Sequence, residues 1–594
     1  MQSLLESGRL TGAPGAHRLV GAIEDVEIPS TVQTVLAARI DRLGDDAKRT
    51  LQTASVIGKE FSGATLSAVA AADERDPLPS TRLAAALDAL RAGEFVHETA
   101  LYPDVEYAFK HPLTQEVAYR SQLGARRTQV HAAVARATEQ LHADKLDERS
   151  ALLAYHWEQA GDALVAARWY ARAARVAGFD SPVEAVRHWE KVWEILASVP
   201  SSEASVALRR QAASQLLLFS WRLGMSSARV DEIFATGKAL AVAAGDIREQ
   251  VCLHHSLICV HAADGNPRRT RPIFEECVAL ADATGDPELR WSARTAFNFA
   301  LWVAGELAAA ERLSDEQMGF AEISPALGIA TIGLSTADSF HQRIPILTDL
   351  GRLRDAAEVI RRAHERARSS GENEIAGWID FWRVRLLARV GDASGALAMA
   401  HQAIESNEKI GSILGRVMAH GHRGLACVLG RHWQDARESL DLALELGRTH
   451  QAAHFLDAHF LAGLAGAHMG LGDGTRAHAL ASEAIETAAS RQLLVLEVRA
   501  RLALARLLRG LEGDDASVGI AAALDRADAL VQTTGARSYA PQILVERARL
   551  AALHGDTEAA QRGLHEAHRL FTDMGATGHA RRLAEETSRR EQSP

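Results

Sequence analysis

Apolar positions recur along most of the chain at helical spacing, and the most regular part of the pattern is a glycine followed by a helix with two alanines on one face. Two alanines seven residues apart lie about two turns along one side of a helix, where a small side chain lets a neighbouring helix approach closely. The glycine supplies the turn that joins two antiparallel helices. We therefore predict that these residues set the packing between helices. The copies are Gly161, Ala166, Ala173; Gly351, Ala356, Ala363; Gly391, Ala396, Ala403; Gly472, Ala477, Ala484; and Gly555, Ala560, Ala567.

The turn glycines also recur at a nearly constant interval. Counted from Gly224, the turns at 265, 305, 351, 391, 430, 472, 513 and 555 follow at steps of 41, 40, 46, 40, 39, 42, 41 and 42 residues, and the alanines after Gly430 are shifted by one. Such a period is typical of a helical-hairpin solenoid, in which each repeat contacts only its neighbours. It resembles tetratricopeptide repeats, whose usual unit is about 34 residues, so we expect longer helices here. A generic helical protein with glycine between helices does not explain register and period together.

The pattern differs ahead of the repeats. Four helices are predicted: one over IPSTVQTVLAARIDRL with Ser30 and Gln33 as a capping box, one over DDAKRTLQTASVIGKEF, and two at 62–72 and 80–92. Two short β-like runs, 95–97 and 105–109, flank a proline-containing turn, and Pro112 begins another helix. Helices that end in a two-stranded wing indicate a winged helix over residues 29–123. The solenoid then takes residues 124–590.

Composition and charge narrow the functional classes. At 594 residues the chain is too long for one core, and its composition favours helices. The net charge of -10 argues against a protein that coats nucleic acid. The four cysteines form no C-x-x-C pair, which disfavours a zinc ribbon or a disulfide framework. Neither a secretory signal nor an uninterrupted apolar stretch of membrane-spanning length is present, so we predict a cytoplasmic protein without a membrane partner.

Three stretches resemble a known bacterial family. IPSTVQTVLAARIDRLGDDAKRTLQTASVIGKEF, DVEYAFKHPLTQEVAYRSQL and FTDMGATGHARRLAEE look like the C-terminal half of proteins that join a class III adenylate/guanylate cyclase domain to a signal-transduction ATPase. That ATPase is similar to those of the LuxR-type and maltose-regulator-type activators. The family order is cyclase, P-loop ATPase, winged helix and tetratricopeptide-like repeats. The resemblance implies that residues 1–28 are the C-terminal end of an ATPase domain.

The departures from this family concern its catalytic parts. No G-x-x-x-x-G-K-[ST] motif occurs: Thr53 and Glu232 stand where the first glycine would precede Gly58-Lys59 and Gly237-Lys238. No stretch resembles the cyclase. We therefore expect a family member without its catalytic front end, with no cofactor in this chain and ATP relevant only if an upstream ATPase domain is supplied.

Candidate catalytic and metal-binding residues also have simpler interpretations. His565-Glu566-Ala567-His568 lacks the spacing of a zincin motif, in which two histidines lie four residues apart. The other paired histidines have no cysteine or carboxylate partners at ligand spacing, and we interpret them as partly buried or solvated helix positions. No G-x-S-x-G motif occurs, and Cys427 lies in an apolar helix. The tryptophans fall at helical spacing beside repeat turns, so we interpret them as inter-repeat core. No catalytic, metal or cofactor residue is predicted, and hence no enzyme activity.

The winged helix carries ten Lys and Arg against thirteen Asp and Glu over residues 29–123, a net charge of -3. A DNA-reading domain concentrates positive charge against phosphates, so we expect a protein-facing joint in which Phe109, His111 and Tyr119 contact neighbouring domains. The predicted function is a regulatory scaffold that binds a protein or ligand on the superhelix and controls an ATPase or cyclase output. The alternatives are a DNA-binding transcription regulator and a fragment of an active cyclase.

Overall fold

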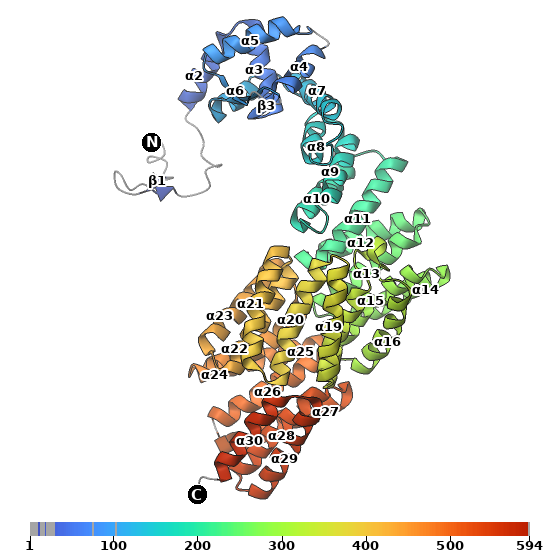
Figure 1. Ribbon diagram of the computed structural model, residues 1–594, viewed down its shortest axis with the longest axis vertical. Helices are drawn as coiled ribbons and strands as arrows, with labels where there is room; N and C mark the ends of the chain where they lie inside the picture. The colour runs from blue at the N-terminus through green and yellow to red at the C-terminus, as the bar shows by residue number, and fades with distance from the viewer. Residues whose placement is uncertain are drawn as a thin grey trace. The chain divides into compact units, whose positions relative to one another are not determined.

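The computed structural model describes residues 10–11, 18–19, 30–73, 76–100, 104–511 and 513–591. They form two compact units, Met1–Val176 with Lys191–Leu208, and Ala177–Glu190 with Arg209–Pro594 (Figure 1). The fold is all-α, a tetratricopeptide-like solenoid preceded by a winged-helix-like domain with a small β wing. None of the helices in these ranges is both long and apolar enough to span a bilayer.

The first unit begins with β1 and β2, which pair antiparallel, and continues into the winged-helix-like part. Its elements are β1 (Leu10–Thr11), β2 (Arg18–Leu19), α2 (Ser30–Asp41), α3 (Asp45–Ile57), β3 (Glu60–Ser62), α4 (Gly63–Ala71), α5 (Ser80–Ala92), β4 (Val96–Ala100), β5 (Glu106–Phe109), α6 (Pro112–Arg120), α7 (Gly124–Leu141), α8 (Ser150–Gln159) and α9 (Ala163–Ala177). Pro112 stands in the first turn of α6 as predicted. The sequence interpretation was wrong at Lys59–Phe61, where the predicted second helix has already ended and β3 forms instead.

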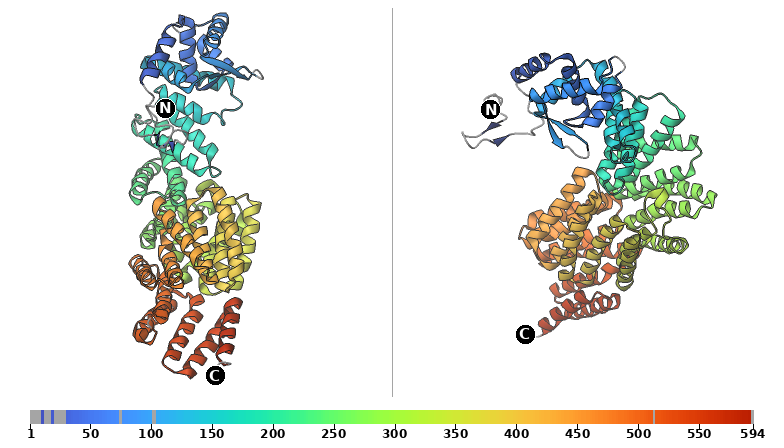
Figure 2. Two further views of the ribbon diagram at one scale, coloured as in Figure 1. Left: turned by 90° about the vertical axis from the view of Figure 1, so that its left-hand side faces the viewer. Right: turned by 45° about the horizontal axis from the view of Figure 1, so that its top comes forward.

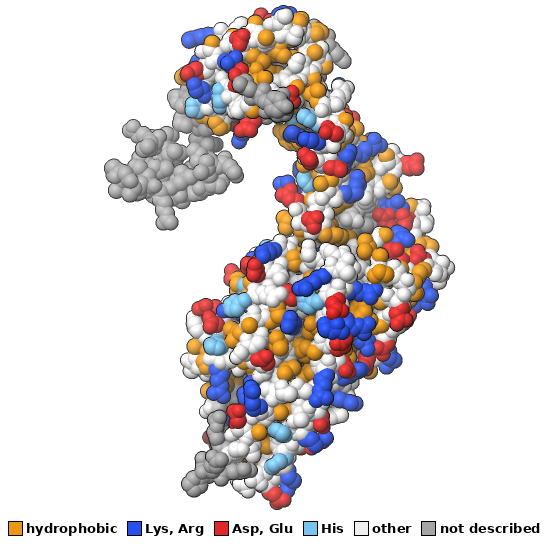
Figure 3. Space-filling model, viewed as in Figure 1, with side chains coloured by type: hydrophobic (Ala, Val, Ile, Leu, Met, Phe, Trp, Pro, Cys, Tyr) orange, Lys and Arg blue, Asp and Glu red, His pale blue; other side chains and the backbone are white. Residues whose placement is uncertain are grey.

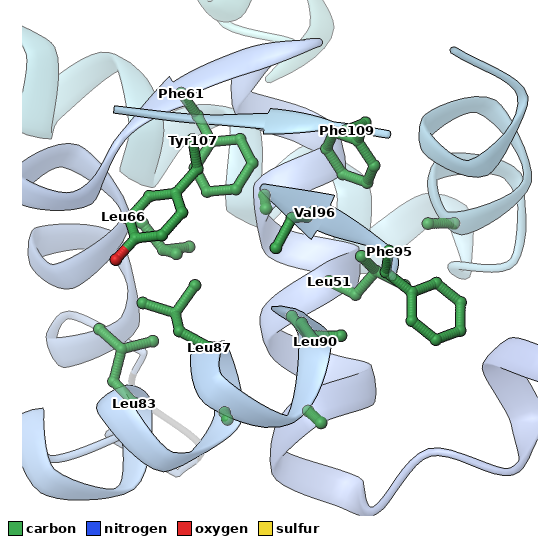
Figure 4. Close-up of a cluster of buried hydrophobic side chains, with 14 of the residues drawn as sticks. Leu51, Phe61, Leu66, Leu83, Leu87, Leu90, Phe95, Val96, Tyr107 and Phe109 are labelled. Carbon is green, nitrogen blue, oxygen red and sulfur yellow. The ribbon is translucent and has the colours of Figure 1, made fainter. Parts of the chain in front are cut away.

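The wing is therefore three-stranded, in the order β3-β5-β4, and it covers one side of the helices. Apolar side chains of α3, α4 and α5 meet those of the strands in one buried cluster (Figure 4). The rings of Phe61 and Phe109 lie 5.7 Å apart, with Leu51 and Leu90 fully buried beside them. Each such side chain contributes roughly 1.5–3 kcal/mol when removed from water, so this cluster holds the strands onto the helices.

Two predictions at the N-terminus fall outside what the structure describes. The assignment of residues 1–28 to the end of an ATPase domain cannot be compared with it, because only the β1–β2 pair is described there. The helix predicted over 28–43 is present as α2, but the side chain of Ser30, the proposed cap, lies outside the described residues.

The second unit is built from helical hairpins (Figure 1). Helices α10 and α11 connect the two units in sequence. The elements are α10 (Pro182–Ala197), α11 (Glu203–Leu223), α12 (Ser227–Ala243), α13 (Ile247–Ala263), η2 (Pro267–Arg269), α14 (Thr270–Thr284), α15 (Pro287–Ala304), α16 (Leu307–Ile323), α17 (Ile329–Ile332), α18 (Ala337–Leu350), α19 (Leu353–Ser369), α20 (Asn373–Val390), α21 (Ala393–Ile410), α22 (Ile413–Gly430), α23 (Trp433–His450), η3 (His454–Leu456), α24 (Asp457–Gly470), α25 (Gly474–Arg491), α26 (Leu494–Leu511), η4 (Gly513–Ala516), α27 (Ser517–Thr534), η5 (Arg537–Tyr539), α28 (Ala540–Leu553), α29 (Thr557–Met574) and α30 (Thr577–Glu591).

Each hairpin turn uses a Gly-Asp pair in the best-matched repeats. Gly391 ends α20 with φ of 89°, a left-handed conformation that glycine adopts without strain, and Asp392 N–H donates back to Leu387 O. The Asp392 carboxylate then accepts the backbone N–H of Gly395 (2.8 Å) and caps α21. Equivalent caps at Asp473 and Asp556 explain why these turns are so short.

Two irregularities of the sequence period have local causes. In the repeat at Gly430, the left-handed residue is Arg431 (φ 61°), and the glycine is still helical. Counted from Arg431, the alanines at 436 and 443 fall five and twelve residues later, and both are fully buried, which restores the register. The long step from Gly305 to Gly351 contains the additional short helix α17.

The helices of each hairpin have different environments. We call α11, α13, α15, α18, α20, α22, α24, α26, α28 and α30 the inner helices and their partners the outer helices. The outer helices bury one stripe, as in α19, where Ala356, Val359, Ile360, Ala363 and Ala367 are buried. The inner helices in the middle of the solenoid are buried on more sides: in α13, every residue from Gln250 to Ala263 is buried. The terminal inner helix α30 still exposes Arg581 and Glu585. The central inner helices therefore face a filled interior.

The expectation that each repeat contacts only its neighbours is wrong. The C-terminal ends of early inner helices meet elements of much later repeats (Figures 1 and 2). Arg582 Nη1–H donates to Gly391 O (2.8 Å), and His579 Nε2 lies 3.2 Å from Ala388 O, both across 191 residues. Gly305 packs against Leu494 and Thr534 in the same way. The superhelix thus closes one turn onto the next, because glycine at these turns leaves room for the backbone of the following turn.

Candidate ligand-binding site

Aromatic residues of the inner helices line a pocket inside the second unit. It leaves about 60 Å³ for the centres of water-sized groups, several times the roughly 10–15 Å³ that one buried water needs. This space fits a side chain or small apolar group and is smaller than a typical drug-sized site. The walls come from helices α11, α13, α15, α18, α20 and α22 together with η3. Its aromatic lining comprises Trp221, Phe299, Trp302, Trp378, Phe381, Trp382 and Phe455.

The polar residues of the pocket form an ordered chain. Trp382 Nε1–H donates to His341 Nε2 (2.8 Å), so His341 carries its proton on Nδ1 and donates it to Asp338 Oδ1 (3.0 Å). Asp338 is buried and also accepts from Gln342 (2.6 Å). This chain fixes the indole of Trp382, whose ring stands edge-on to Trp302 at 5.2 Å.

Two buried donors of rings that line the pocket have no acceptor among the described residues. The indole N–H groups of Trp221 (8% exposed) and Trp378 (2% exposed) make no hydrogen bond, and the two rings lie 5.5 Å apart. Leaving a buried donor unpaired costs about 1–3 kcal/mol. Both rings line the pocket, but their nitrogens are covered by protein, so a bound carbonyl oxygen pairs with them only if the rings turn.

Arg222 supports these two indoles. Its guanidinium is 1% exposed, lies 4.2 Å from the ring of Trp221, and is paired with Glu374 at 2.9 Å. The Nη1–H group donates to Leu218 O (2.6 Å). Because this arginine is neutralised by Glu374, it stiffens the wall without adding net charge to it.

A second polar region begins behind Trp302 and Trp382. Asp349, 0% exposed, accepts from Trp302 Nε1–H (2.9 Å) and from Arg385 (2.6 Å). The Arg385 guanidinium lies 5.5 Å from the Trp302 ring and 5.4 Å from the Trp382 ring. The aromatic pocket and this charged region therefore share two walls.

The histidines of the inner helices are more buried than the sequence interpretation allowed. His255 and His422 are fully buried, and burial lowers their pKa to about 4 and about 3 respectively, with Arg385 depressing the pKa of His422 further. Both are therefore neutral at pH 7. Among the described residues, no cluster of three or more His, Cys, Asp or Glu side chains has the arrangement of a metal site.

The predicted packing alanines lie elsewhere, on outer helices and on α9. All ten are buried, and all five of their turn glycines have positive φ, from 75° to 89°. That they set the helix spacing stays a prediction for substitution experiments. The sequence interpretation missed the pocket because Trp221, Trp302, Trp378 and Trp382 have the spacing of core residues. The available signal was that these four tryptophans gather in inner helices together with buried charges.

The three residues predicted to contact neighbouring domains have different surroundings. Phe109 lies inside the winged-helix core, where it packs on Phe61 (Figure 4). His111 is exposed at the start of α6. Tyr119 lies 3.0 Å from His131 Nε2 of α7, whose Nδ1 in turn lies 2.9 Å from Nδ1 of His156 in α8. Of these three residues, only Tyr119 therefore contacts the helices that follow the winged-helix part.

Comparison with known proteins gives similarity of fold alone. No protein-family model matches the chain, and no curated protein matches it. A Rap protein complexed with Competence and Sporulation Factor is 11% identical, with a TM-score of 0.48, over 63% of this chain and 99% of that one. A signal transduction ATPase with a tetratricopeptide repeat sensor from Pyrococcus horikoshii is 12% identical, with a TM-score of 0.30, over 87% and 66%. Aspartyl phosphate phosphatase F from Bacillus subtilis is 11% identical, with a TM-score of 0.36, over 63% and 95%.

Proposed function

We propose that this protein is a non-catalytic regulatory module whose solenoid binds a peptide or small ligand in its interior. The observation that carries this proposal is the aromatic pocket with the unpaired donors of Trp221 and Trp378. A fold under selection for stability alone gains nothing from two buried N–H groups without acceptors, whereas a binding site gains orientation from them. Peptides supply both an apolar side chain for the pocket and carbonyl groups for the donors.

The proposal extends to regulation of an ATPase or cyclase domain. Its support is the sequence resemblance of residues 29–123 to the joint that follows such ATPases. In this proposal, the ligand binds one conformation of the solenoid more tightly than another. Binding therefore shifts the conformational equilibrium of the domains joined to the solenoid. A member of the resembling family with its ATPase domain attached gives the test: pocket ligands must change its ATP turnover.

Selection of peptides from a random library on the purified chain tests the binding function. A selected peptide should bind the Trp378→Phe variant about tenfold more weakly, because the ring remains and the N–H donor is lost. Trp433→Phe, on outer helix α23 outside the pocket, is the matched control and should bind normally. Peptides that bind both variants with wild-type affinity would place recognition away from this pocket.

The DNA-binding alternative has no support on the face of the first unit that Figure 3 shows. On the visible face of the first unit, acidic and basic side chains are interspersed (Figure 3). Several of its arginines are already engaged, such as Arg82 with Asp46 (2.6 Å) and Arg126 with Asp73. A mobility shift of duplex DNA that weakens steeply with added salt would support this alternative over the one proposed.

A further inference from the structure

Three arginines of the inner helices converge behind the aromatic pocket, and we call Arg385, Arg389 and Arg499 the arginine cluster. Arg385 and Arg389 lie one helical turn apart on α20, and Arg499 comes from α26. The Arg389 guanidinium stacks on the ring of Tyr539 at 3.9 Å. Arg499 donates to His459, whose ring lies 6.3 Å from that of His422. The His422 ring lies 5.6 Å from the ring of Trp382, which Arg385 covers at 5.4 Å. The three residues thus share one environment although they lie far apart in sequence.

The charges of this cluster do not balance. Asp349 pairs with Arg385, whereas neither Arg389 nor Arg499 forms an ion pair with any carboxylate in the described parts of the chain. The buried Glu546 of α28 pairs with Arg506, Arg509 and Arg549 instead. A buried charge without a counter-charge is strongly unfavourable, and most proteins avoid it.

Arg499 is half-buried. Burial lowers the pKa of its guanidinium to about 9, so the group still carries its charge at pH 7. Arg389 and Arg499 nevertheless keep part of their surface accessible to solvent. Part of each of these two residues is therefore within reach of a small solute.

The cluster also presents unused donors. The Nε–H of Arg385, which is 5% exposed, and one Nη2–H₂ group of Arg389 have no acceptor among the described residues. Arg499 Nη1–H donates to His459 Nε2, so neutral His459 carries its proton on Nδ1, and that nitrogen too has no partner. Donors alone, with surplus positive charge, are the complement of an oxyanion.

We infer that the arginine cluster binds the oxyanion of a ligand, a carboxylate or a phosphate, whose apolar group occupies the adjoining aromatic pocket. The shared walls Trp302 and Trp382 join the two parts, since Arg385 stacks on both rings. The inference rests on the proposed binding function and adds a chemical class to it: an organic anion with an aromatic or branched apolar group. The guanidinium fork pairs with either oxyanion. The experiment distinguishes the two because one probe carries a carboxylate and the other a phosphate.

Thermal unfolding of the full chain with three probes at constant ionic strength tests this inference. Phenylacetate and phenyl phosphate represent the two oxyanions, and phenylacetamide is their neutral counterpart. At least one anion should raise Tm saturably, while phenylacetamide should give a much smaller rise, because binding to the folded state stabilises it by mass action. The more effective anion identifies the preferred headgroup. No rise with either anion, or an equal rise with phenylacetamide, would overturn the inference.

Variants separate a binding role from a structural one. Arg499→Gln should weaken anion affinity at least about tenfold while leaving the anion-free Tm unchanged or higher, because it removes an unbalanced buried charge. Arg389→Gln should behave alike and serves if the first variant does not fold. Arg383→Gln, on the exposed side of the same helix, is the control and should respond as wild type. A lowered anion-free Tm with an intact anion response would contradict the inference.

Failure of the anion site can be distinguished from failure of the proposed binding function. If the anion and amide probes bind equally and Trp378→Phe weakens both, the pocket binds ligands and only the anion site is disproved. If selected peptides bind independently of the pocket, the binding function fails, whatever the anions do.

Discussion

The inner and outer helices of the solenoid have the same backbone conformation but bury different kinds of side chain. Outer helices bury one alanine stripe and expose the rest, as α21 buries Ala396, Ala400 and Ala403 and exposes Glu405. Central inner helices such as α18, α20 and α22 are buried on most sides and still contain Asp349, Arg385 and His422. The outer helices thus favour close packing, whereas the inner helices tolerate unfavourable burial of polar groups. That difference is why we propose that binding takes place on the inner helices.

The largest effect is expected from the one carboxylate within the inner charged region. Asp349→Asn should destabilise the protein by about 3–5 kcal/mol, because it leaves Arg385 buried without a counter-charge. Unfolding in denaturant measures this loss. Asp355→Asn on outer helix α19 breaks only an exposed pair with Arg352, and it should change stability by less than about 1 kcal/mol. Comparable losses at the two positions would remove the distinction between inner and outer charges.

The next largest effect is expected from a large side chain in place of a buried alanine on an outer helix. Ala403→Leu should cost on the order of 1–3 kcal/mol, whereas Glu405→Leu on the exposed face should stay within about 0.5 kcal/mol. Hydrogen exchange should lose protection first around residues 375 to 445. The contact of α20 with α30 means that α30 should lose protection as well. Equal effects of the two substitutions would show that the alanine register is not the packing register.

The contact between superhelical turns can be isolated with two glycines. A Cβ at Gly391 (φ 89°) would lie 2.5 Å from the backbone nitrogen of His579, whereas one at Gly411 (φ 74°) meets nothing within 4 Å. Alanine at either position carries the left-handed penalty of roughly 1–2 kcal/mol. Gly391→Ala should therefore destabilise more, by a further 1–3 kcal/mol or so. Identical unfolding free energies for the two variants would mean that closure of the superhelix contributes nothing to stability.

The last effect concerns pH. Burial lowers the pKa of His422 from 6.5 to about 3, so the unfolded state takes up a proton that the folded state refuses as the pH falls below 6.5. Stability should therefore decline between pH 6.5 and 4, by up to about 1.4 kcal/mol per pH unit from each such histidine. Arg385 and Arg499 are the charges that face His422 and strengthen this effect.

Replacing His422 should reduce that slope. His422→Gln should lower the pH dependence of the unfolding free energy by about one proton over this range, whereas His432→Gln, exposed at the start of an outer helix, should not. An unchanged slope in His422→Gln would show that His422 accepts its proton in the folded state.

Sequence by itself determined the features that depend on neighbouring residues. The glycine and alanine register placed the hairpin turns, because left-handed turns and small helix faces are local requirements. Pro112 and the β-like runs likewise placed the start of α6 and two strands of the wing. It failed at β3, which forms only because it pairs with β5, a strand that lies after two intervening helices.

Tertiary structure alone decided the candidate site. The pocket combines α11 with α22 and η3, and the arginine cluster combines α20 with α26, so both depend on how far each repeat rotates relative to the last. That rotation is a small geometric increment that accumulates over the repeats, and no residue pattern within one repeat specifies its sum. A tryptophan in the core and a tryptophan in the pocket consequently have the same spacing in sequence. Only closure of the superhelix gives Trp302 and Arg385 one common interior.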